Sequence, residues 1–168
     1  MKTEIKLAFA TFFFSMCILS IFAAPGSAED YEALKGVKSI KALFDFRDGK
    51  PQSALIHVKL VHQTYKDKAI TKIGDNPDFV VVFMASSVKL LSKNRDSFSS
   101  EEKKHLDEMD KVISAMSKDG IKLEICMFAA NLFGVASESV SPEINRVHNG
   151  WISSMGYQAK GYSLIPAY

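Results

Sequence analysis

Hydrophobic and polar positions along residues 40–68 follow two patterns in turn, one typical of strands and one typical of helices. Residues 40–46 form a short apolar and aromatic run that ends before an Asp-Gly pair, which predicts a strand followed by a turn. From residue 52 to about residue 68, apolar side chains recur at intervals of three and four, which predicts a helix with Pro51 in its first turn. This part of the chain therefore predicts a strand, a turn and a helix.

The middle of the chain contains a continuous apolar run and then a helix with a marked start and end. Residues 79–85 are apolar without alternation, which is typical of a central parallel strand covered on both faces. Ser99 and Glu102 have the spacing of a capping box, and an acidic first turn and apolar positions at helical spacing follow up to Gly120. A helix is therefore predicted over residues 99–119.

The alternation of strands and helices continues to the end of the chain. The patterns predict a strand at 121–126, a short helix at 127–133, a strand at 144–148, a helix at 150–160 and a strand at 162–165. In the 150–160 helix, Trp151, Ile152 and Met155 have the spacing of side chains that pack against a neighbour. Together these segments predict one α/β domain with a mostly parallel sheet of about five strands.

The amino-terminal segment has the three-part layout of a secretory signal peptide. Two lysines among the first six residues precede an uncharged run at residues 7–24, and Gly26 and Ala28 lie three and one positions before a cleavage site at Glu29. An uncleaved membrane anchor is the alternative, because this uncharged run of 18 residues is just long enough to span a bilayer as a helix. We expect residues 1–28 to be removed and the protein to be exported, to the periplasm or elsewhere outside the cytoplasm.

Composition limits what the remaining domain, residues 29–168, can be. The whole chain, with 47% hydrophobic and 24% charged residues, has the composition of an ordinary globular protein, which excludes collagen-like and largely disordered proteins. The whole chain has a net charge of +2, and the mature segment carries 19 basic and 18 acidic residues. This balance gives no electrostatic reason to expect a nucleic acid or an anionic membrane as a partner.

Removal of the signal segment would take away Cys17 and leave Cys126 as the one cysteine of an exported protein. A lone thiol in that compartment is buried and inert, paired with another chain, or chemically employed. Cys126 lies where a predicted strand meets a predicted helix, the place where functional groups gather in open α/β sheets. Amides of the first helical turn would stabilise its reactive thiolate form. The alternative is a small buried hydrophobe among apolar neighbours.

Other residue types with functional chemistry give weaker signals. His62 shares an apolar helical stripe with Leu55 and Val58 and is interpreted as a packed histidine, whereas His105 lies in a charged, solvated run. His148 would assist a thiolate only if the fold brings it near Cys126. The Cys and His spacing does not fit a zinc site and no Gly-rich loop fits a phosphate, so we expect no metal and no cofactor.

Two motifs in the second half of the chain, taken with their order and spacing, carry a resemblance to a known family. The first is a cysteine that ends a predicted strand after a Gly-Ile entry, at residues 120–126. The second is a closing Gln-x-x-Gly-Tyr-x-x-Ile-Pro segment at residues 158–166. With the apolar strand at 79–85 and the helix after it, residues 40–168 resemble DsrE/DsrF-like proteins.

The resemblance implies a three-layer α/β/α sandwich that assembles into trimers or hexamers. It also implies that Cys126 carries a persulfide sulfur between donor and acceptor proteins, as in sulfur-relay members of the family. The loops expected beside this cysteine supply the remaining candidate binding residues, which are Ser86, Ser87, His148, Asn149 and Gly150. This chain departs from the family in its expected export and in having Ala85-Ser86-Ser87 where a Gly-containing loop is common.

Three functions remain open from the sequence. The first is an envelope protein, carrier or sulfurtransferase, that handles sulfane sulfur on Cys126. The second is a non-catalytic oligomeric binding or scaffold module of the same fold with a buried structural thiol. The third is a redox sensor that forms an interchain disulfide. The first needs a thiol that can be reached, and the second needs Cys126 to be dispensable.

Overall fold

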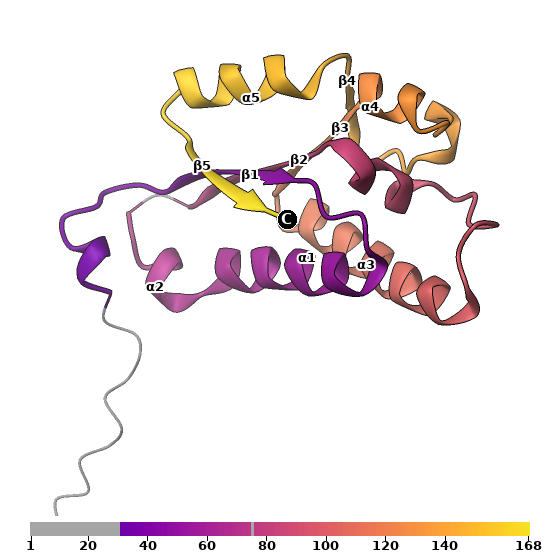
Figure 1. The fold of residues 1–168 in the computed structure, drawn as a ribbon. Helices are drawn as coiled ribbons and strands as arrows, with labels where there is room; N and C mark the ends of the chain where they lie inside the picture. The colour runs from indigo at the N-terminus through magenta and orange to yellow at the C-terminus, as the bar shows by residue number, and fades with distance from the viewer. Residues whose placement is uncertain (1–30, 75) are drawn as a thin grey trace, which may run out of the picture.

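The computed structural model of the protein describes residues 31–74 and 76–168 (Figure 1). The predicted signal segment, residues 1–28, lies outside the described residues. The elements are, in chain order, η1 (Glu32–Leu34), β1 (Lys41–Phe46), α1 (Pro51–Lys66), α2 (Lys68–Thr71), β2 (Asp78–Phe83), η2 (Ala85–Leu91), α3 (Ser100–Lys118), β3 (Lys122–Cys126), α4 (Met127–Leu132), η3 (Ser137–Ser139), β4 (Asn145–Val147), α5 (Gly150–Ala159) and β5 (Ser163–Ala167).

The five described strands form one sheet in which every pairing is parallel. Their order is β4-β3-β2-β1-β5, so β2 lies at the centre. Its residues from Phe79 to Phe83 are almost fully buried, which confirms the prediction of a central strand covered on both faces. The expected fold class, an α/β domain with a parallel sheet of about five strands, is confirmed.

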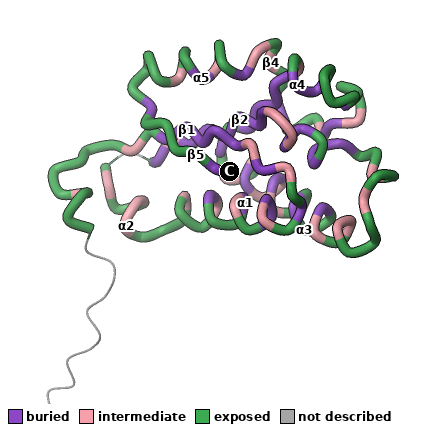
Figure 2. The backbone as a smooth tube through the Cα atoms, in the orientation of Figure 1, coloured by how far each residue is buried: buried purple, intermediate pink, exposed green. Residues whose placement is uncertain are grey.

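Helices cover both faces of the sheet and make a three-layer sandwich. In Figure 1, α1 and α3 lie along one face of the sheet, and α4 and α5 lie along the other. Figure 2 shows the buried backbone concentrated in the sheet between these layers. The strands and the inner faces of α1 and α3 supply most of the apolar core, because parallel sheets are stable only when both faces are removed from water.

The helix starts follow from local sequence. Ser99 Oγ accepts a hydrogen bond from the Glu102 amide, and Glu102 Oε2 accepts one from the Ser99 amide at 2.8 Å, so the predicted capping box at α3 is confirmed. The helix predicted from residue 52 to about 68 is divided in two. Asp67 takes an extended conformation and caps α2 by accepting a hydrogen bond from the Ala69 amide at 2.7 Å, which ends α1 at Lys66.

The expectation that the apolar side chains of α5 pack against a neighbouring element is wrong within a single chain. Trp151, Ile152 and Met155 on α5 are 63%, 61% and 60% exposed, although their spacing suggested burial. The inner face of α5 is instead polar, and Tyr157 donates a hydrogen bond to the buried Glu124 carboxylate at 2.8 Å. Because this hydrogen bond sets the orientation of α5, its apolar stripe faces away from the sheet.

His62 on α1 is half-buried, as the sequence suggested, and it has a polar partner that the sequence did not indicate. Its Nε2 lies 2.6 Å from Oδ2 of Asp119, the residue that ends α3. Tyr65, one turn further along α1, donates to the backbone carbonyl of the same residue at 2.9 Å. These two contacts join the helices of one layer.

A polar cluster holds the amino-terminal edge of the sheet together. Lys122 Nζ lies 2.8 Å from Oδ1 of Asp78, and the Tyr162 hydroxyl donates to the other oxygen of that carboxylate. Burial raises the pKa of Asp78, but the hydrogen bonds from Lys122 and Tyr162 outweigh it, and the pKa lies below its ordinary value. The cluster joins the starts of β2 and β3 to the residue before β5.

We predict that this cluster makes stability depend on pH. The pKa of Asp78 is lower in the folded state, so its contribution is present above the ordinary aspartate pKa and is lost as pH falls through the folded value. Asp78→Asn should therefore lower the free energy of unfolding near pH 7, by at most about 1 kcal/mol because the ion pair is partly solvated. Near pH 3 the effect should be smaller, as measured by urea denaturation.

The control is Asp96→Asn, which changes an exposed aspartate in a loop. It should leave the free energy of unfolding nearly unchanged at both pH values. An equal loss from Asp78→Asn near pH 7 and near pH 3 would contradict the electrostatic account of the cluster.

Candidate functional site

The carboxyl ends of β1, β2 and β3 meet at one edge of the sheet and form the floor of a pocket of about 370 Å³. In parallel sheets this edge is where ligands bind, because the loops that leave it surround a crevice. The pocket is mostly apolar and contains one guanidinium and one thiol. It is lined by Arg47, Met84, Ala85, Cys126, Phe128, Ala129, Leu132, Phe133, Asn149 and Trp151.

Cys126 is the last residue of β3 and the residue from which α4 begins. Its side chain lines the pocket, although the residue as a whole is only 5% exposed. Within the described residues it is the one free cysteine. The predicted place of this thiol, at the junction of a strand and a short helix, is therefore correct, and its contact with solvent is through the pocket.

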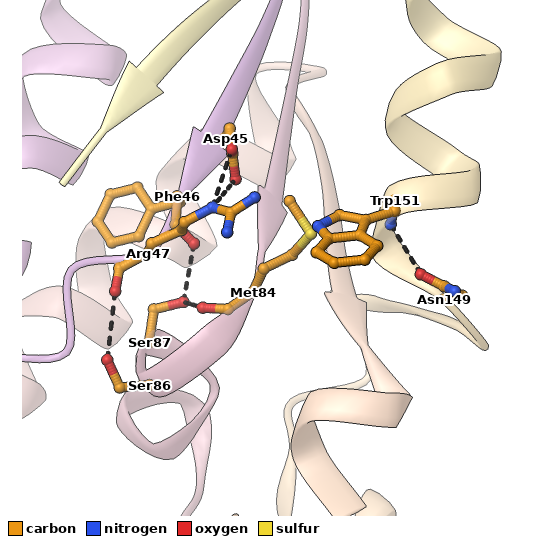
Figure 3. Close-up of polar contacts among 8 residues, drawn as sticks. All are labelled: Asp45, Phe46, Arg47, Met84, Ser86, Ser87, Asn149 and Trp151. Atoms are coloured by element: carbon orange, nitrogen blue, oxygen red, sulfur yellow. Dashed lines mark hydrogen bonds and ion pairs between the residues drawn. The ribbon is translucent and has the colours of Figure 1, made fainter. Parts of the chain in front are cut away.

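The loop after β4 approaches the thiol with its backbone more than with its side chains. The carbonyl of His148 accepts a hydrogen bond from the Phe128 amide at 3.0 Å, so this amide of the first turn of α4 is already used. The side chain of His148 is exposed and is not part of the pocket lining. Asn149 does line the pocket, and its Oδ1 caps α5 by accepting from the Trp151 amide at 2.9 Å (Figure 3).

Gly150 brings the start of α5 directly against Cys126. A Cβ atom added to Gly150 would lie 3.0 Å from Cys126 Cβ and 2.7 Å from Met84 Sδ, closer than real side chains pack. The absence of a side chain therefore allows a helix start to meet the thiol.

The loop after β2 holds together the strand ends that form the pocket floor. Ser87 is fully buried, with its Oγ 2.9 Å from the Phe46 carbonyl and 2.7 Å from the Met84 carbonyl, so it joins the ends of β1 and β2 (Figure 3). Ser86 donates to the Arg47 carbonyl at 3.3 Å. Both predicted serines thus lie under the pocket and hold its floor, while the adjacent Met84 and Ala85 line it.

Ala85 has a positive φ of 50°, a left-handed conformation that favours glycine. The loop Ala85-Ser86-Ser87 therefore begins with a residue other than glycine in this conformation. The turn therefore stores some conformational strain at the pocket wall.

Arg47 is the charged pocket residue among those that the sequence interpretation missed. Its Nε lies 2.9 Å from each oxygen of the buried Asp45 carboxylate, and its backbone amide donates to the Ala167 carbonyl at 2.9 Å. The hydrogen bond to Asp45 raises the pKa of Arg47 above its already high ordinary value. Arg47 follows β1 directly, so the rule that identified Cys126, a functional group at the carboxyl end of a strand, could have found it.

A second polar group lies under α5, two residues before the thiol. The carboxylate of Glu124 accepts hydrogen bonds from Tyr157 at 2.8 Å and from Ser153. Burial and the bond to Glu124 raise the pKa of Tyr157 well above its ordinary value, so the tyrosine stays protonated and continues to donate. These bonds keep α5 over the sheet and therefore keep Gly150 against Cys126.

The entrance to the pocket is apolar. We call Phe128, Leu132 and Trp151 the pocket rim; they are 66%, 74% and 63% exposed.

Within residues 31–74 and 76–168, the structure places no three His, Cys, Asp or Glu side chains together so as to hold a metal ion. In the same part of the chain, none of the helices is long and apolar enough to cross a membrane.

Comparison with known proteins gives a family and a shared fold. The model of the DsrE/DsrF-like family matches residues 16–167. The chain is similar in structure to a protein of unknown function, MTH1491, from Methanobacterium thermoautotrophicum, with 13% identity and a TM-score of 0.59 over 76% of this chain and 99% of that one. It is also similar to the ychN protein from E. coli, with 9% identity and a TM-score of 0.54 over 77% and 100% of the two chains. None of the curated proteins matches the chain.

The contact at Gly150 gives a prediction for the site. Gly150→Ala should push Met84 and Cys126 apart and lower the free energy of unfolding by about 1 to 3 kcal/mol, as overpacking does. Gly156→Ala is the matched control on the same helix, because nothing lies within 4 Å of the added Cβ. It should raise stability by about 0.5 to 1 kcal/mol through helix propensity. Equal effects of the two changes in thermal denaturation would contradict the contact.

Proposed function

The chain belongs to the DsrE/DsrF-like family, and from this premise we propose that it carries sulfane sulfur as a persulfide on Cys126 in the cell envelope. Family membership supports a general role related to sulfur relay. The observation that carries the finer proposal is the position of Cys126, a free thiol that lines an apolar pocket at the carboxyl edge of the sheet.

The proposed chemistry is two exchanges at sulfur. In the first, the Cys126 thiolate attacks the terminal sulfur of a donor R–S–SH, an S–S bond forms to Cys126, the donor S–S bond breaks, and R–S⁻ leaves. In the second, the thiolate of an acceptor attacks the outer sulfur of the Cys126 persulfide and the Cys126 thiolate leaves. Each exchange conserves electrons overall, so no cofactor is required.

The pocket suits a reactive sulfur that must be held and then released. Its apolar walls, which include Phe128, Phe133 and Trp151, limit the access of water to the outer sulfur. The low exposure of Cys126 protects the inner sulfur, while the open rim leaves a path for an acceptor thiol. Donor and acceptor proteins would therefore meet the molecule at the pocket rim.

The proposed location rests on the sequence. The charged start, the apolar run at residues 7–24 and the small residues Gly26 and Ala28 together favour export, to the periplasm or elsewhere outside the cytoplasm. In an oxidising compartment, a chain left with one cysteine cannot lose it to an intrachain disulfide.

A second candidate function has one observation in its favour. Cys126 is only 5% exposed, which suits a non-catalytic oligomeric binding module in which the thiol is a small apolar filler. The two candidates differ in whether the native thiol reacts.

We predict that polysulfide adds sulfur to Cys126 in the native protein. Intact-mass spectrometry should show a gain of one or more sulfur atoms that a thiol reductant removes, because a persulfide is reducible. Cys126→Ser should gain none. Because the expected mature protein lacks residues 1–28, Cys126 is its one cysteine and no second thiol can account for the added sulfur. If the native thiol takes no sulfur and is alkylated only after unfolding, the binding-module candidate is favoured.

We also propose that copies of the chain associate, as trimers or hexamers, through the α4 and α5 layer. Apolar side chains on this layer are exposed in a single chain, among them Leu132, Trp151 and Ile152. Exposed apolar area of this kind often marks an interface between proteins. A second copy on this layer would contact part of the pocket rim and add to the wall of the site.

Light scattering at micromolar concentration should then give a mass of at least three chains. Ile152→Glu should lower this mass, because it places a charge in the proposed interface. Ile56→Glu is the matched control, since Ile56 is 53% exposed against 61% for Ile152 but lies on α1 in the opposite layer. A monomeric original chain, or dissociation by the α1 change alone, would refute this interface.

A further inference from the structure

The polar chemistry of the pocket is concentrated in one cation. Of the residues that line it, Arg47 is the one with a charged side chain, and the wall around it is largely apolar and aromatic. The Arg47 side chain is about one-third exposed, so it is in contact with both the pocket and solvent. Its charge is paired with the Asp45 carboxylate, so an anion in the pocket would be bound through the remaining N–H donors of the guanidinium.

The orientation of the guanidinium is fixed from one side. Both carboxylate oxygens of Asp45 lie 2.9 Å from Arg47 Nε, and the structure gives the Nη1 and Nη2 groups no hydrogen-bond acceptor among the described residues. Figure 3 shows the side chain extending from the end of β1 toward Met84 and Trp151, with Asp45 along its Nε edge. The Nη groups are therefore a fork of donors in the same pocket as the thiol, a geometry that suits an anion.

We propose that Arg47 binds the negatively charged part of the sulfur donor, so that the pocket selects small anionic sulfane compounds over neutral ones. The inference rests on the proposed function of Cys126 and names its substrate class. It follows from the size of the pocket, about 370 Å³, which fits a small molecule, and from the single guanidinium in its wall.

The same contact would help the reaction as well as binding. For a hydropolysulfide donor, R in R–S–SH is a sulfur chain that already carries one negative charge. When the Cys126 thiolate attacks the terminal sulfur, the leaving chain departs with a second negative charge and then takes a proton from water. Arg47 would be close to this developing charge, and a fixed donor of this kind stabilises it.

Two alkylating reagents of nearly equal size test the inference directly. Iodoacetate is an anion and iodoacetamide is neutral, and both react by attack of the thiolate on carbon with loss of iodide. The measured quantity is the ratio of their rate constants at native Cys126, relative to the same ratio for free cysteine. We expect the protein to favour iodoacetate, and Arg47→Gln to lower the ratio roughly tenfold, the effect of one charge-assisted hydrogen bond.

Two variants separate this role from structural effects and from general charge. Arg47→Lys keeps the charge but loses the fork, and should lower the ratio less than Arg47→Gln does. Lys89→Gln removes a second cation, which lies 5.6 Å from the Phe133 ring at the pocket, and should leave the ratio nearly unchanged. A purely structural role of Arg47 would change both rate constants together and leave their ratio as it was.

The outcomes distinguish this inference from the proposed function. If Cys126 gains sulfur from polysulfide but Arg47→Gln leaves the ratio unchanged, or Lys89→Gln lowers it equally, the inference is overturned and the carrier function stands. If iodoacetate is favoured through Arg47 but Cys126 gains no sulfur, the anion site stands and the carrier function falls. If neither reagent reaches the native thiol, the inference is overturned as well.

Discussion

The register of the parallel strands is the constraint on which the site depends. Phe46, Phe83 and Ile125 lie side by side on β1, β2 and β3. The residues that follow them, Arg47, Met84 and Cys126, are therefore neighbours in the pocket although they are far apart in sequence. Successive side chains of a strand point to opposite faces of the sheet. A shift of one residue in any of these pairings would therefore point the side chain of a pocket residue toward the helices on the other face.

Sequence patterns predicted the parts of this arrangement that are local. The strands, the capping box at Ser99 and the place of Cys126 depend on residues close in sequence, and the structure confirms them. The order and register of the strands depend on which segments pair across the sheet, and no local pattern encodes that. Arg47 follows β1 directly and a strand-end rule could have found it, but that its pocket is also the pocket of Cys126 depends on this pairing.

Polar residues under the pocket show a second limit of sequence interpretation. Serines in a loop after a strand suggest ligand contacts, yet Ser87 is buried and bonded to the backbone at the ends of β1 and β2. The apolar stripe of α5 suggested burial, yet hydrogen bonds to Glu124 set the orientation of the helix. In both places the geometry follows from the requirement that buried polar groups form hydrogen bonds. The partners of these groups are known only once the three-dimensional neighbours are known.

The missing side chain at Gly150 also has a consequence for how this protein can change over generations. The start of α5, the Met84 side chain and the β-carbon of Cys126 share one small volume, with no room for an added carbon. A larger residue at position 150 would require the Met84 side chain to move or to become smaller, whereas replacing the Cys126 sulfur alone would leave its β-carbon in the same place. Variation at position 150 is therefore tied to the residue at position 84, and losing the thiol would not by itself release it.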